Sequence, residues 1–319
     1  MNSNKSILVT GAEGFLGRNI VQRLLDKEYH IIQSIKYKHL QKKKLSDVFF
    51  VIHLSQKIQL PPVSIDYVVH LAARAHILKE TASNPLREYR EVNTMGTLRL
   101  AEAAALHGVK RFIFLSSIGV NGNISNERPF SELDPPNPHN DYTQSKYEAE
   151  QGLLKIAKET GMKVVIIRPP LVYGPGVKAN FLKMMKWVYR GIPLPLGAIN
   201  NQRSLIALDN LADLIMLCIE HPAAANQIFL AADGEDVSIT ELLTKLAHFL
   251  GKPARLIPVP QNLLEATLNI LGKRNLAIRL CGSLQVDINK ARNLLGWNPP
   301  LSLDEGLNKT AKWFLQTKT

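Results

Sequence analysis

Residues 7–17 read Ile-Leu-Val-Thr-Gly-Ala-Glu-Gly-Phe-Leu-Gly, a segment that predicts a strand, a tight turn and the start of a helix. Its first four residues form an apolar, β-branched run typical of a buried strand, and Phe15 to Leu25 then places apolar residues at helical spacing. In such a strand-turn-helix unit Gly11 permits the tight turn, Gly14 lets the backbone approach a pyrophosphate, and Gly17 lets helix and strand pack closely. The free amides at the helix N-terminus then face the anion.

The glycine spacing is GxxGxxG, which differs from the GxGxxG of the dehydrogenase fingerprint. Three glycines also occur in ordinary surface turns, but here they stand between a strand and a helix, as phosphate binding requires. Alternating strand and helix patterns continue to about Gly174, which predicts an α/β fold with a doubly wound parallel sheet and right-handed crossovers.

A second group of residues can handle a proton. The apolar run from Lys110 ends in Ser116 and Ser117, and ligands of open α/β sheets lie at the carboxyl ends of strands. Tyr142 and Lys146 share one face of a predicted helix. A tyrosine with its ordinary pKa of about 10 is a poor base, but a nearby ammonium favours the phenolate, and a serine hydroxyl can orient a substrate oxygen. A lone YxxxK is common on solvated helices; with the serines and the glycine turn it predicts hydride transfer to or from a nicotinamide.

The chain resembles the extended short-chain dehydrogenase/reductase family, and within it the nucleotide-sugar 4-epimerases and 4-ketoreductases. The resemblance runs almost end to end and rests on the residues above and on four further segments, 68–73, 92–97, 168–176 and 295–297. It implies a Rossmann-type doubly wound parallel sheet with a smaller C-terminal substrate lobe. We expect residues 1–174 and about 205–233 to bind the dinucleotide, and residues 175–204 and 234–319 to bind a nucleotide sugar.

The resemblance also implies roles for individual residues. Ser117, Tyr142 and Lys146 would be the catalytic triad. Asn93 would support the active-site lysine directly or through water, with a helix cap as the alternative. The residues expected to contact the cofactor are Gly11, Gly14, Phe15, Leu16, Gly17, Lys36, Leu71, Ala72, Ala73, Asn93, Ser116, Tyr142, Lys146, Pro169, Pro170 and Leu171, the last two beside the nicotinamide carboxamide.

The end of the second predicted strand bears on the choice of cofactor. NAD-preferring members usually carry an acid there for the ribose 2′-hydroxyl, but Lys36, Tyr37 and Lys38 follow this strand. A cation suits a 2′-phosphate, so the sequence favours NADP over NAD; a solvated strand end is the alternative. His53 stands where the family commonly has an aspartate for the adenine, which puts that contact in doubt.

Three residues of the C-terminal half are candidates for substrate binding. Asn180, Arg203 and Arg279 resemble family positions that contact the nucleotide diphosphate. A planar guanidinium can bind two phosphate oxygens at once. The alternatives are an N-cap for Asn180 and a surface salt bridge for Arg203.

Composition agrees with a soluble enzyme. The chain has 319 residues, a formal net charge of +12 and two cysteines, each in an apolar stretch, so we expect no disulfide framework and no metal site. No segment approaches the ~20 apolar residues of a bilayer span, and the chain runs almost directly into the first strand, which predicts a cytoplasmic protein without a signal peptide. No nucleic-acid-binding motif accompanies the lysine-rich run 36–44, which we expect to be solvated.

These features predict oxidoreduction at C4 of a UDP-sugar. The main hypothesis is reduction of UDP-4-keto-6-deoxy-N-acetylglucosamine to UDP-N-acetylquinovosamine, or the reverse, in bacterial lipopolysaccharide or other surface-polysaccharide synthesis. A 4-epimerase for UDP-glucose or UDP-N-acetylglucosamine with tightly bound NAD is the alternative, and a non-catalytic dinucleotide-binding regulator is a third. By resemblance, a helix within 91–107 and the catalytic helix would pair two copies into a homodimer.

Overall fold

The structure of the protein is a computed structural model, which describes residues 5–35, 48–51, 54, 56, 58–75, 83–125 and 127–317. Its main body is a seven-stranded sheet with the order β3-β2-β1-β4-β5-β6-β9, in which every neighbouring pair is parallel. The strands are β1 (Ser6–Thr10), β2 (His30–Ile35), β3 (Val48–Val51), β4 (Tyr67–His70), β5 (Arg111–Leu115), β6 (Lys163–Arg168) and β9 (Gln227–Leu230). The strand order reverses between β1 and β4, the place where such sheets bind ligands. The predicted doubly wound α/β fold is confirmed.

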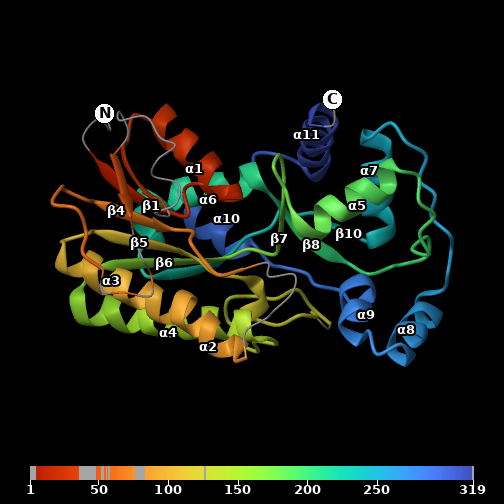
Figure 1. Cartoon of the computed structure of the whole chain (residues 1–319), viewed down its shortest axis with the longest axis horizontal. Helices are drawn as coiled ribbons and strands as arrows, with labels where there is room; N and C mark the ends of the chain where they lie inside the picture. The colour runs from red at the N-terminus through yellow and green to blue at the C-terminus, as the bar shows by residue number, and fades with distance from the viewer. Residues whose placement is uncertain are drawn as a thin grey trace.

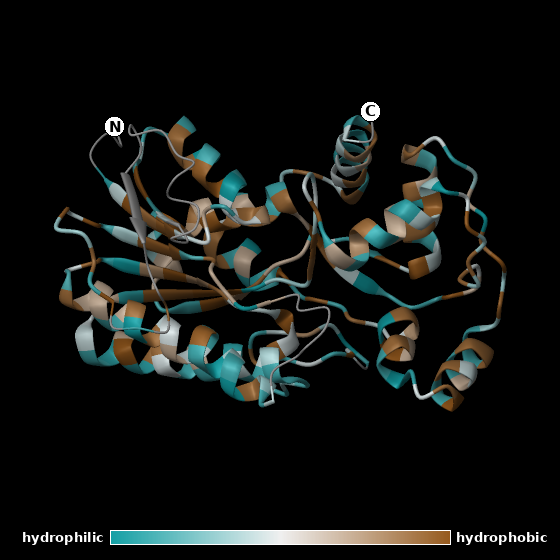
Figure 2. Cartoon of the chain, in the orientation of Figure 1, coloured by the Kyte–Doolittle hydropathy of each residue, from teal (hydrophilic) through white to brown (hydrophobic). Residues whose placement is uncertain are grey.

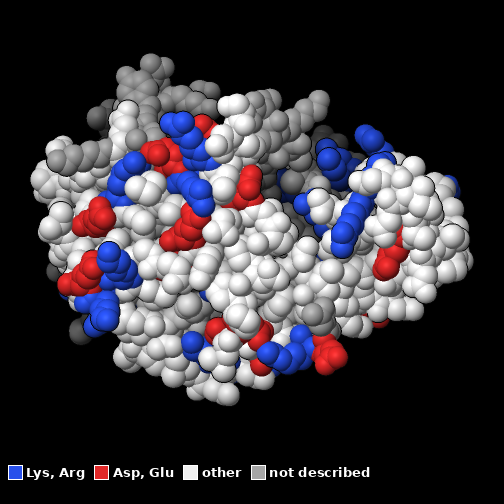
Figure 3. Space-filling view, turned by 90° about the horizontal axis from the view of Figure 1, so that it is seen from below, with Lys and Arg blue, Asp and Glu red and all other residues white. Residues whose placement is uncertain are grey.

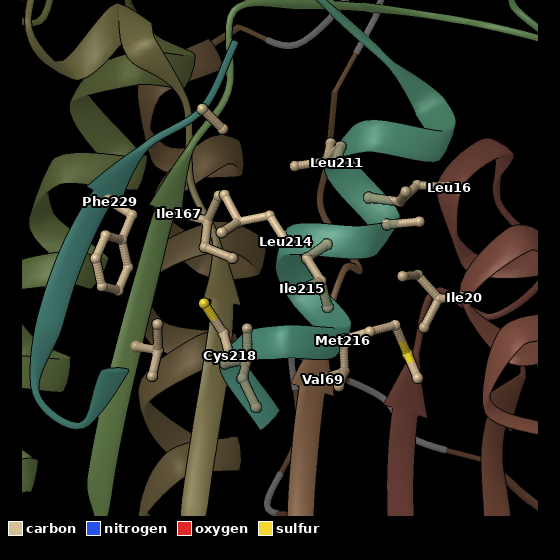
Figure 4. Close-up of a cluster of buried hydrophobic side chains, with 14 of the residues drawn as sticks. Leu16, Ile20, Val69, Ile167, Leu211, Leu214, Ile215, Met216, Cys218 and Phe229 are labelled. Carbon is tan, nitrogen blue, oxygen red and sulfur yellow. The ribbon is translucent and has the colours of Figure 1, made fainter. Parts of the chain in front are cut away.

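Helices cover both faces of this sheet (Figure 1). On one face lie α1 (Phe15–Asp26), α6 (Leu208–Glu220) and α10 (Asn289–Leu295); on the other lie α2 (Pro85–Tyr89), the π-helix η2 (Arg90–Met95), α3 (Gly96–Leu106) and α4 (Asp141–Thr160). Because successive strand residues point to opposite faces, Ile7 and Val9 enter the core under α1 and α6, whereas Leu8 enters the core under α3 and α4. Figure 4 shows the first core, where apolar side chains of α6 meet those of α1 and the sheet.

A second, smaller lobe is built on a three-stranded sheet with the order β10-β8-β7. Its strands are β7 (Leu171–Tyr173), β8 (Arg203–Ala207) and β10 (Asp236–Val237), and its helices are α5 (Ala179–Tyr189), α7 (Ile239–Phe249), α8 (Gln261–Ile270), α9 (Arg274–Cys281) and α11 (Leu303–Gln316). A separate apolar cluster that includes Phe181, Leu243 and Phe314 forms its core. The predicted boundaries near residues 174, 204 and 233 stay a prediction.

Chain crossings fasten the two lobes together. The buried Tyr173 hydroxyl lies 2.8 Å from Asp233 Oδ2 and 3.3 Å from the Leu303 carbonyl oxygen. At another crossing, the Ser125 amide donates to the Ser283 carbonyl (2.9 Å) and the Phe130 amide to the Gln285 carbonyl (2.8 Å). The loop after β5 is thereby held against the segment that follows α9.

Two sequence predictions lie outside the described residues. Lys36, with the rest of the lysine-rich run 36–44, and His53 fall in segments that the structure does not describe. Within the described part of the chain, no helix combines the length and the apolar character that a bilayer crossing needs.

Candidate active site

The glycine turn forms a tight cradle at the carboxyl end of β1. Gly11 has a φ of +69°, and the Gly14 amide donates to its carbonyl over 2.9 Å. A Cβ on Gly11 would lie 2.8 Å from the Ala72 nitrogen, and one on Gly17 would collide with the Gly11 carbonyl oxygen. Because α1 begins at Phe15 without a side-chain cap, its first amides are open to an anion. This geometry fits the pyrophosphate of a dinucleotide.

A buried chain of hydrogen bonds holds Ala72, which packs against Gly11 of the glycine turn. The Ala72 amide donates to Thr10 Oγ1 (3.3 Å), Thr10 Oγ1 lies 2.6 Å from His70 Nδ1, and His70 Nε2 lies 2.9 Å from Thr97 Oγ1. Since the Thr97 hydroxyl donates its proton to the Asn93 carbonyl, His70 Nε2 carries the ring proton and Nδ1 accepts from Thr10. Burial lowers the pKa of His70 to about 3, so the ring is neutral. Sequence reasoning assigned no role to His70; its only signal was a polar residue at the end of an apolar strand.

Asn93 joins the cofactor side of the site to the catalytic helix. It accepts from the Arg74 amide (2.7 Å), and its Nδ2 donates to the Arg74 carbonyl and to Ser145 Oγ, both at 3.1 Å. The alternative role as a helix cap is wrong, because Asn93 lies inside η2. The Asn93 side chain forms its hydrogen bonds with Arg74 and Ser145, so it supports Lys146 only indirectly, through the helix that carries both Ser145 and Lys146.

Tyr142 and Lys146 stand in the first two turns of α4. Asn140 and Thr143 form a capping box that fixes the start of this helix. One turn after Tyr142, Lys146 Nζ donates to the Leu115 carbonyl at the end of β5 (2.8 Å) and lies 4.4 Å from the ring centre of Phe114. The helix therefore holds both side chains at the carboxyl edge of the sheet.

Ser117 comes to the same edge from the loop after β5. Its Oγ accepts from the Gly119 amide (3.1 Å), which leaves the hydroxyl proton available to a substrate oxygen. Gly119 packs so closely on Thr143 that a Cβ there would collide with the threonine methyl group. The structure thus brings the Ser117 turn against the start of the helix that carries Tyr142.

The electrostatics of the pair differ from the expectation drawn from the sequence. Burial raises the pKa of Tyr142 to about 12, helped by Tyr89, whose ring centre lies 6.1 Å away. Burial lowers the pKa of Lys146 to about 7, partly opposed by Glu150. The expected stabilisation of the phenolate is therefore absent here, because desolvation dominates and the lysine is bonded to the Leu115 carbonyl. In this form Tyr142 is a neutral proton donor.

A buried ion pair lies under the catalytic edge. Arg168 Nε contacts both oxygens of Glu150 (3.0 and 3.2 Å), and their side chains are 3% and 0% exposed. Arg168 Nη1 also donates to Asn121 Oδ1 over 2.9 Å. The Ser116 hydroxyl donates to Glu150. The Ser116 hydroxyl is thus engaged with this ion pair, and its predicted cofactor contact stays a prediction. Sequence reasoning missed the ion pair.

The other described residues that we expect to contact the cofactor differ in how far their side chains are exposed to solvent. Leu16 is buried in the main core, where it packs against other apolar side chains. Phe15 is partly buried and packs against the cores of both lobes. The Pro169 carbonyl accepts from the Ile118 amide over 2.9 Å. Leu71 and Ala72 are half-buried, Ala73 is exposed, Pro169 and Pro170 are buried, and Leu171 is exposed.

Arg203 lies at the end of the helix that carries Arg279, since it is bonded to Gly282, the residue that follows α9. Arg203 Nη1 donates to the Gly282 carbonyl over 2.9 Å, a neutral partner that leaves the positive charge available to an anion. Burial, and then the charge of Arg279, lowers the pKa of Arg203. Burial and the charge of Arg279 also lower the pKa of His139, which bonds the Gly119 backbone. His139 lies close to the Ser117 turn, since a Cβ on Gly119 would lie 3.3 Å from its ring and 3.4 Å from Ser117 Oγ. Sequence reasoning missed this histidine, which lies in a proline-rich loop.

Asn180 does not cap its helix, and its predicted contact with the nucleotide diphosphate stays a prediction. It is the second residue of α5 and is exposed, and the N-cap of that helix is Lys178, which makes no side-chain cap. The N-cap alternative is therefore wrong. The preceding Ala179 has a φ of +51°, a left-handed conformation that is uncommon outside glycine.

Comparison with known proteins agrees with this geometry. Residues 7–232 match the model of the NAD dependent epimerase/dehydratase family. The chain belongs to this family. It is 48% identical over 316 residues to UDP-glucose 4-epimerase of Vibrio cholerae, which covers 98% of this chain and 96% of the relative. It is 27% identical over 332 residues to N-acetyl-alpha-D-glucosaminyl-diphospho-ditrans,octacis-undecaprenol 4-epimerase of Escherichia coli O157:H7, which covers 97% and 95%.

A solved structure gives the same result. The UDP-glucose 4-epimerase of Thermotoga maritima with UDP-glucose superimposes with a TM-score of 0.77 at 25% identity, covering 98% of this chain and 100% of that one. The predicted family is therefore confirmed, and the protein is an enzyme of the NAD-dependent epimerase/dehydratase family. The predicted preference for NADP stays a prediction.

Proposed function

We propose that this enzyme inverts the configuration at C4 of a UDP-hexose or UDP-N-acetylhexosamine with NAD as its resident cofactor. The observation that carries the proposal is that Ser117, Tyr142 and Lys146 come together after β5, at the same carboxyl edge of the parallel sheet as the glycine cradle after β1. The close relation to the UDP-glucose 4-epimerase of Vibrio cholerae supports the same reaction.

The chain's own residues supply binding and proton transfer. Gly11, Gly14 and the first amides of α1 would hold NAD, which would supply the hydride chemistry at C4. The Ser117 hydroxyl would donate a hydrogen bond to the sugar O4. The Tyr142 phenol, neutral here, would first have to lose its own proton to solvent; its oxygen would then take the O4 proton and give it back. Arg203 and Arg279 hold the diphosphate by charge-assisted hydrogen bonds while the sugar ring turns over between the two hydride transfers. Removal and return of one hydride and one proton leave the cofactor unchanged.

The second candidate is reduction of UDP-4-keto-6-deoxy-N-acetylglucosamine to UDP-N-acetylquinovosamine. The absence of an acid after β2, where Lys36 to Lys38 follow, favours a cofactor that exchanges as NADP. Tyr142 would then give its proton to O4, and the oxidised cofactor would leave. The non-catalytic alternative loses its support, because the family and the named relatives are enzymes.

Product analysis of the purified enzyme separates these reactions. We expect UDP-glucose or UDP-N-acetylglucosamine to give its C4 epimer, detected by NMR, with no net change in the absorbance of reduced nicotinamide. Stoichiometric oxidation of added NADPH with the 4-keto sugar would support the reductase. Tyr142→Phe should abolish turnover, and Tyr147→Phe, on the same helix, should keep it. If neither substrate reacts while the wild-type fold is intact, both proposals fail.

A further inference from the structure

The α8–α9 hairpin ends in an unusually apolar tip. Ile270 is 86% exposed, Leu271 60%, Leu263 59% and Leu276 42%. The chain turns between the helices at Gly272, which has a φ of +69°. Figure 2 shows brown residues on both helices at the end of the smaller lobe. Single exposed apolar residues are ordinary on a protein surface, but Ile270, Leu271 and Leu276 all lie within four residues of this turn, and such a cluster is typical of an interaction site.

Cations flank the turn itself, and Glu265 on α8 is the acid nearest to it before the turn. Lys273 and Arg274 are exposed and follow the turn directly, and Arg279 lies farther along α9. Between Ala266 and Val286 the sequence contains no aspartate or glutamate. Figure 3 shows the lobe that carries α8 and α9 as mostly uncharged surface with more blue than red. Apolar residues flanked by cations are what binds the headgroup region of an anionic bilayer.

The charges at the tip also argue against self-association there. In a two-fold pairing of this tip, the same surface of each copy would face the other. Lys273 and Arg274 would then approach their own counterparts, and the tip segment offers no acid to offset the repulsion. An anionic partner fits both the apolar and the charged side chains better than a second copy does.

The tip stands close to the substrate side of the catalytic edge. Helix α9 begins at Arg274 and carries Arg279 in its last turn, beside Arg203. Five residues of α-helix span about 8 Å, so the tip is near the predicted diphosphate site. Figure 1 shows α8 and α9 at the end of the molecule opposite β1 and α1.

We propose that the α8–α9 tip docks this enzyme onto the surface of an anionic lipid bilayer. Ile270 and Leu271 enter the boundary between headgroups and acyl chains, and Lys273 and Arg274 bind lipid phosphates. Docking in this way places the substrate side of the enzyme at the membrane surface. The proposal concerns a second surface and does not depend on which C4 reaction the enzyme performs.

Vesicle flotation with the full-length enzyme tests the docking. We expect it to float with vesicles of phosphatidylethanolamine and phosphatidylglycerol, and to remain in solution with pure phosphatidylcholine or at high salt. Each of two double variants, Ile270→Ser/Leu271→Ser and Lys273→Glu/Arg274→Glu, should lower the bound fraction at least about tenfold. For the charge variant this follows because each cation near an anionic surface contributes about fivefold to binding. The matched variants Leu25→Ser/Leu133→Ser and Lys27→Glu/Lys312→Glu also change exposed residues, but away from the tip, and should float like the wild type.

Two further measurements keep the outcomes distinct. The tip variants should turn over a water-soluble UDP-sugar at the wild-type rate, which shows that they fold. Failure of the wild type to bind the anionic vesicles, or equal loss in tip and control variants, would overturn the proposal. It would also be overturned if light scattering showed that the tip variants turn a dimer into a monomer, because a second copy would then cover the tip. If turnover is absent but the tip-dependent flotation holds, the proposed reaction fails and the docking stands.

Discussion

At Lys146, burial sets how stability depends on pH. The folded pKa of about 7 lies below the ordinary 10.5, so between these values the unfolded chain holds a proton that the folded protein has lost. The free energy of unfolding therefore rises with pH across this window, and the cost of the buried ammonium is fully present below it. We expect Lys146→Met to lack this rise, so that its stability relative to wild type falls between about pH 7 and about pH 10.5.

Urea denaturation of nucleotide-free protein at several pH values measures this difference. Lys158→Met changes an exposed lysine on the same helix and should run parallel to the wild type. A difference between Lys146→Met and wild type that stays constant with pH would contradict the expectation.

The neighbouring serines 116 and 117 should fail in different ways. Ser117 keeps its proton for the substrate, whereas Ser116 gives its proton to buried Glu150. Ser117→Ala should lower kcat by roughly 100-fold with little change in stability, as loss of one oriented donor does. Ser116→Ala should instead cost about 1–3 kcal/mol of stability, because it removes a donor from a buried carboxylate. Steady-state kinetics and urea denaturation on both variants check this. A loss of kcat in Ser116→Ala and a loss of stability in Ser117→Ala would contradict the assignment.

At the scale of elements, α4 and β6 are joined by the buried pair of Glu150 and Arg168. Glu150→Gln would leave the arginine charge buried with only neutral partners, so we expect a loss of about 3–5 kcal/mol in the free energy of unfolding. Glu159→Gln breaks an exposed pair with Lys155 at 3.8 Å and should cost less than about 1 kcal/mol. Equal effects in the two variants, measured by urea denaturation, would show that the buried pair is not needed.

The join between β1 and α1 gives another prediction. In an ordinary helix Gly→Ala gains stability, but a Cβ at Gly17 would collide with the Gly11 carbonyl that shapes the cradle. We expect Gly17→Ala to lower the affinity for NAD at least about tenfold, measured by calorimetry, because the turn must open. Gln22→Ala, exposed on the same helix, should bind NAD like the wild type. Unchanged affinity in Gly17→Ala would mean that the turn is free to shift.

Sequence patterns predicted the elements better than the contacts between them. The strand, turn and helix of residues 7–25 and the helix of Tyr142 follow from local periodicity and turn chemistry, which need no knowledge of distant residues. The bonds from Ser116 to Glu150 and from Asn93 to Arg74 join separate elements, and no local pattern encodes them. The sequence did not predict the direction of the Tyr142 pKa shift for the same reason, because the burial that causes it depends on how distant parts of the chain pack together.

Across the whole molecule, Tyr173 links the two lobes. It is fully buried at the end of β7, and its hydroxyl donates toward Asp233, which also accepts from the Ala207 amide and from Asn210 Nδ2. The carbonyl of Leu303, the first residue of α11, lies 3.3 Å from the same hydroxyl. Three distant parts of the chain thus meet at one phenol.

Tyr173→Phe should weaken both lobes together. The variant keeps the ring but leaves an oxygen of the buried Asp233 short of one donor, so we expect a loss of about 1–3 kcal/mol. Because the carboxylate is shared by β8, α6 and β7, the variant should still unfold in a single transition, at lower denaturant concentration. Urea denaturation followed by circular dichroism and by tryptophan fluorescence tests this, with Tyr147→Phe as the control. Two separate transitions in Tyr173→Phe alone would mean that this hydroxyl is what couples the lobes, and an unchanged midpoint would mean that the other crossings suffice.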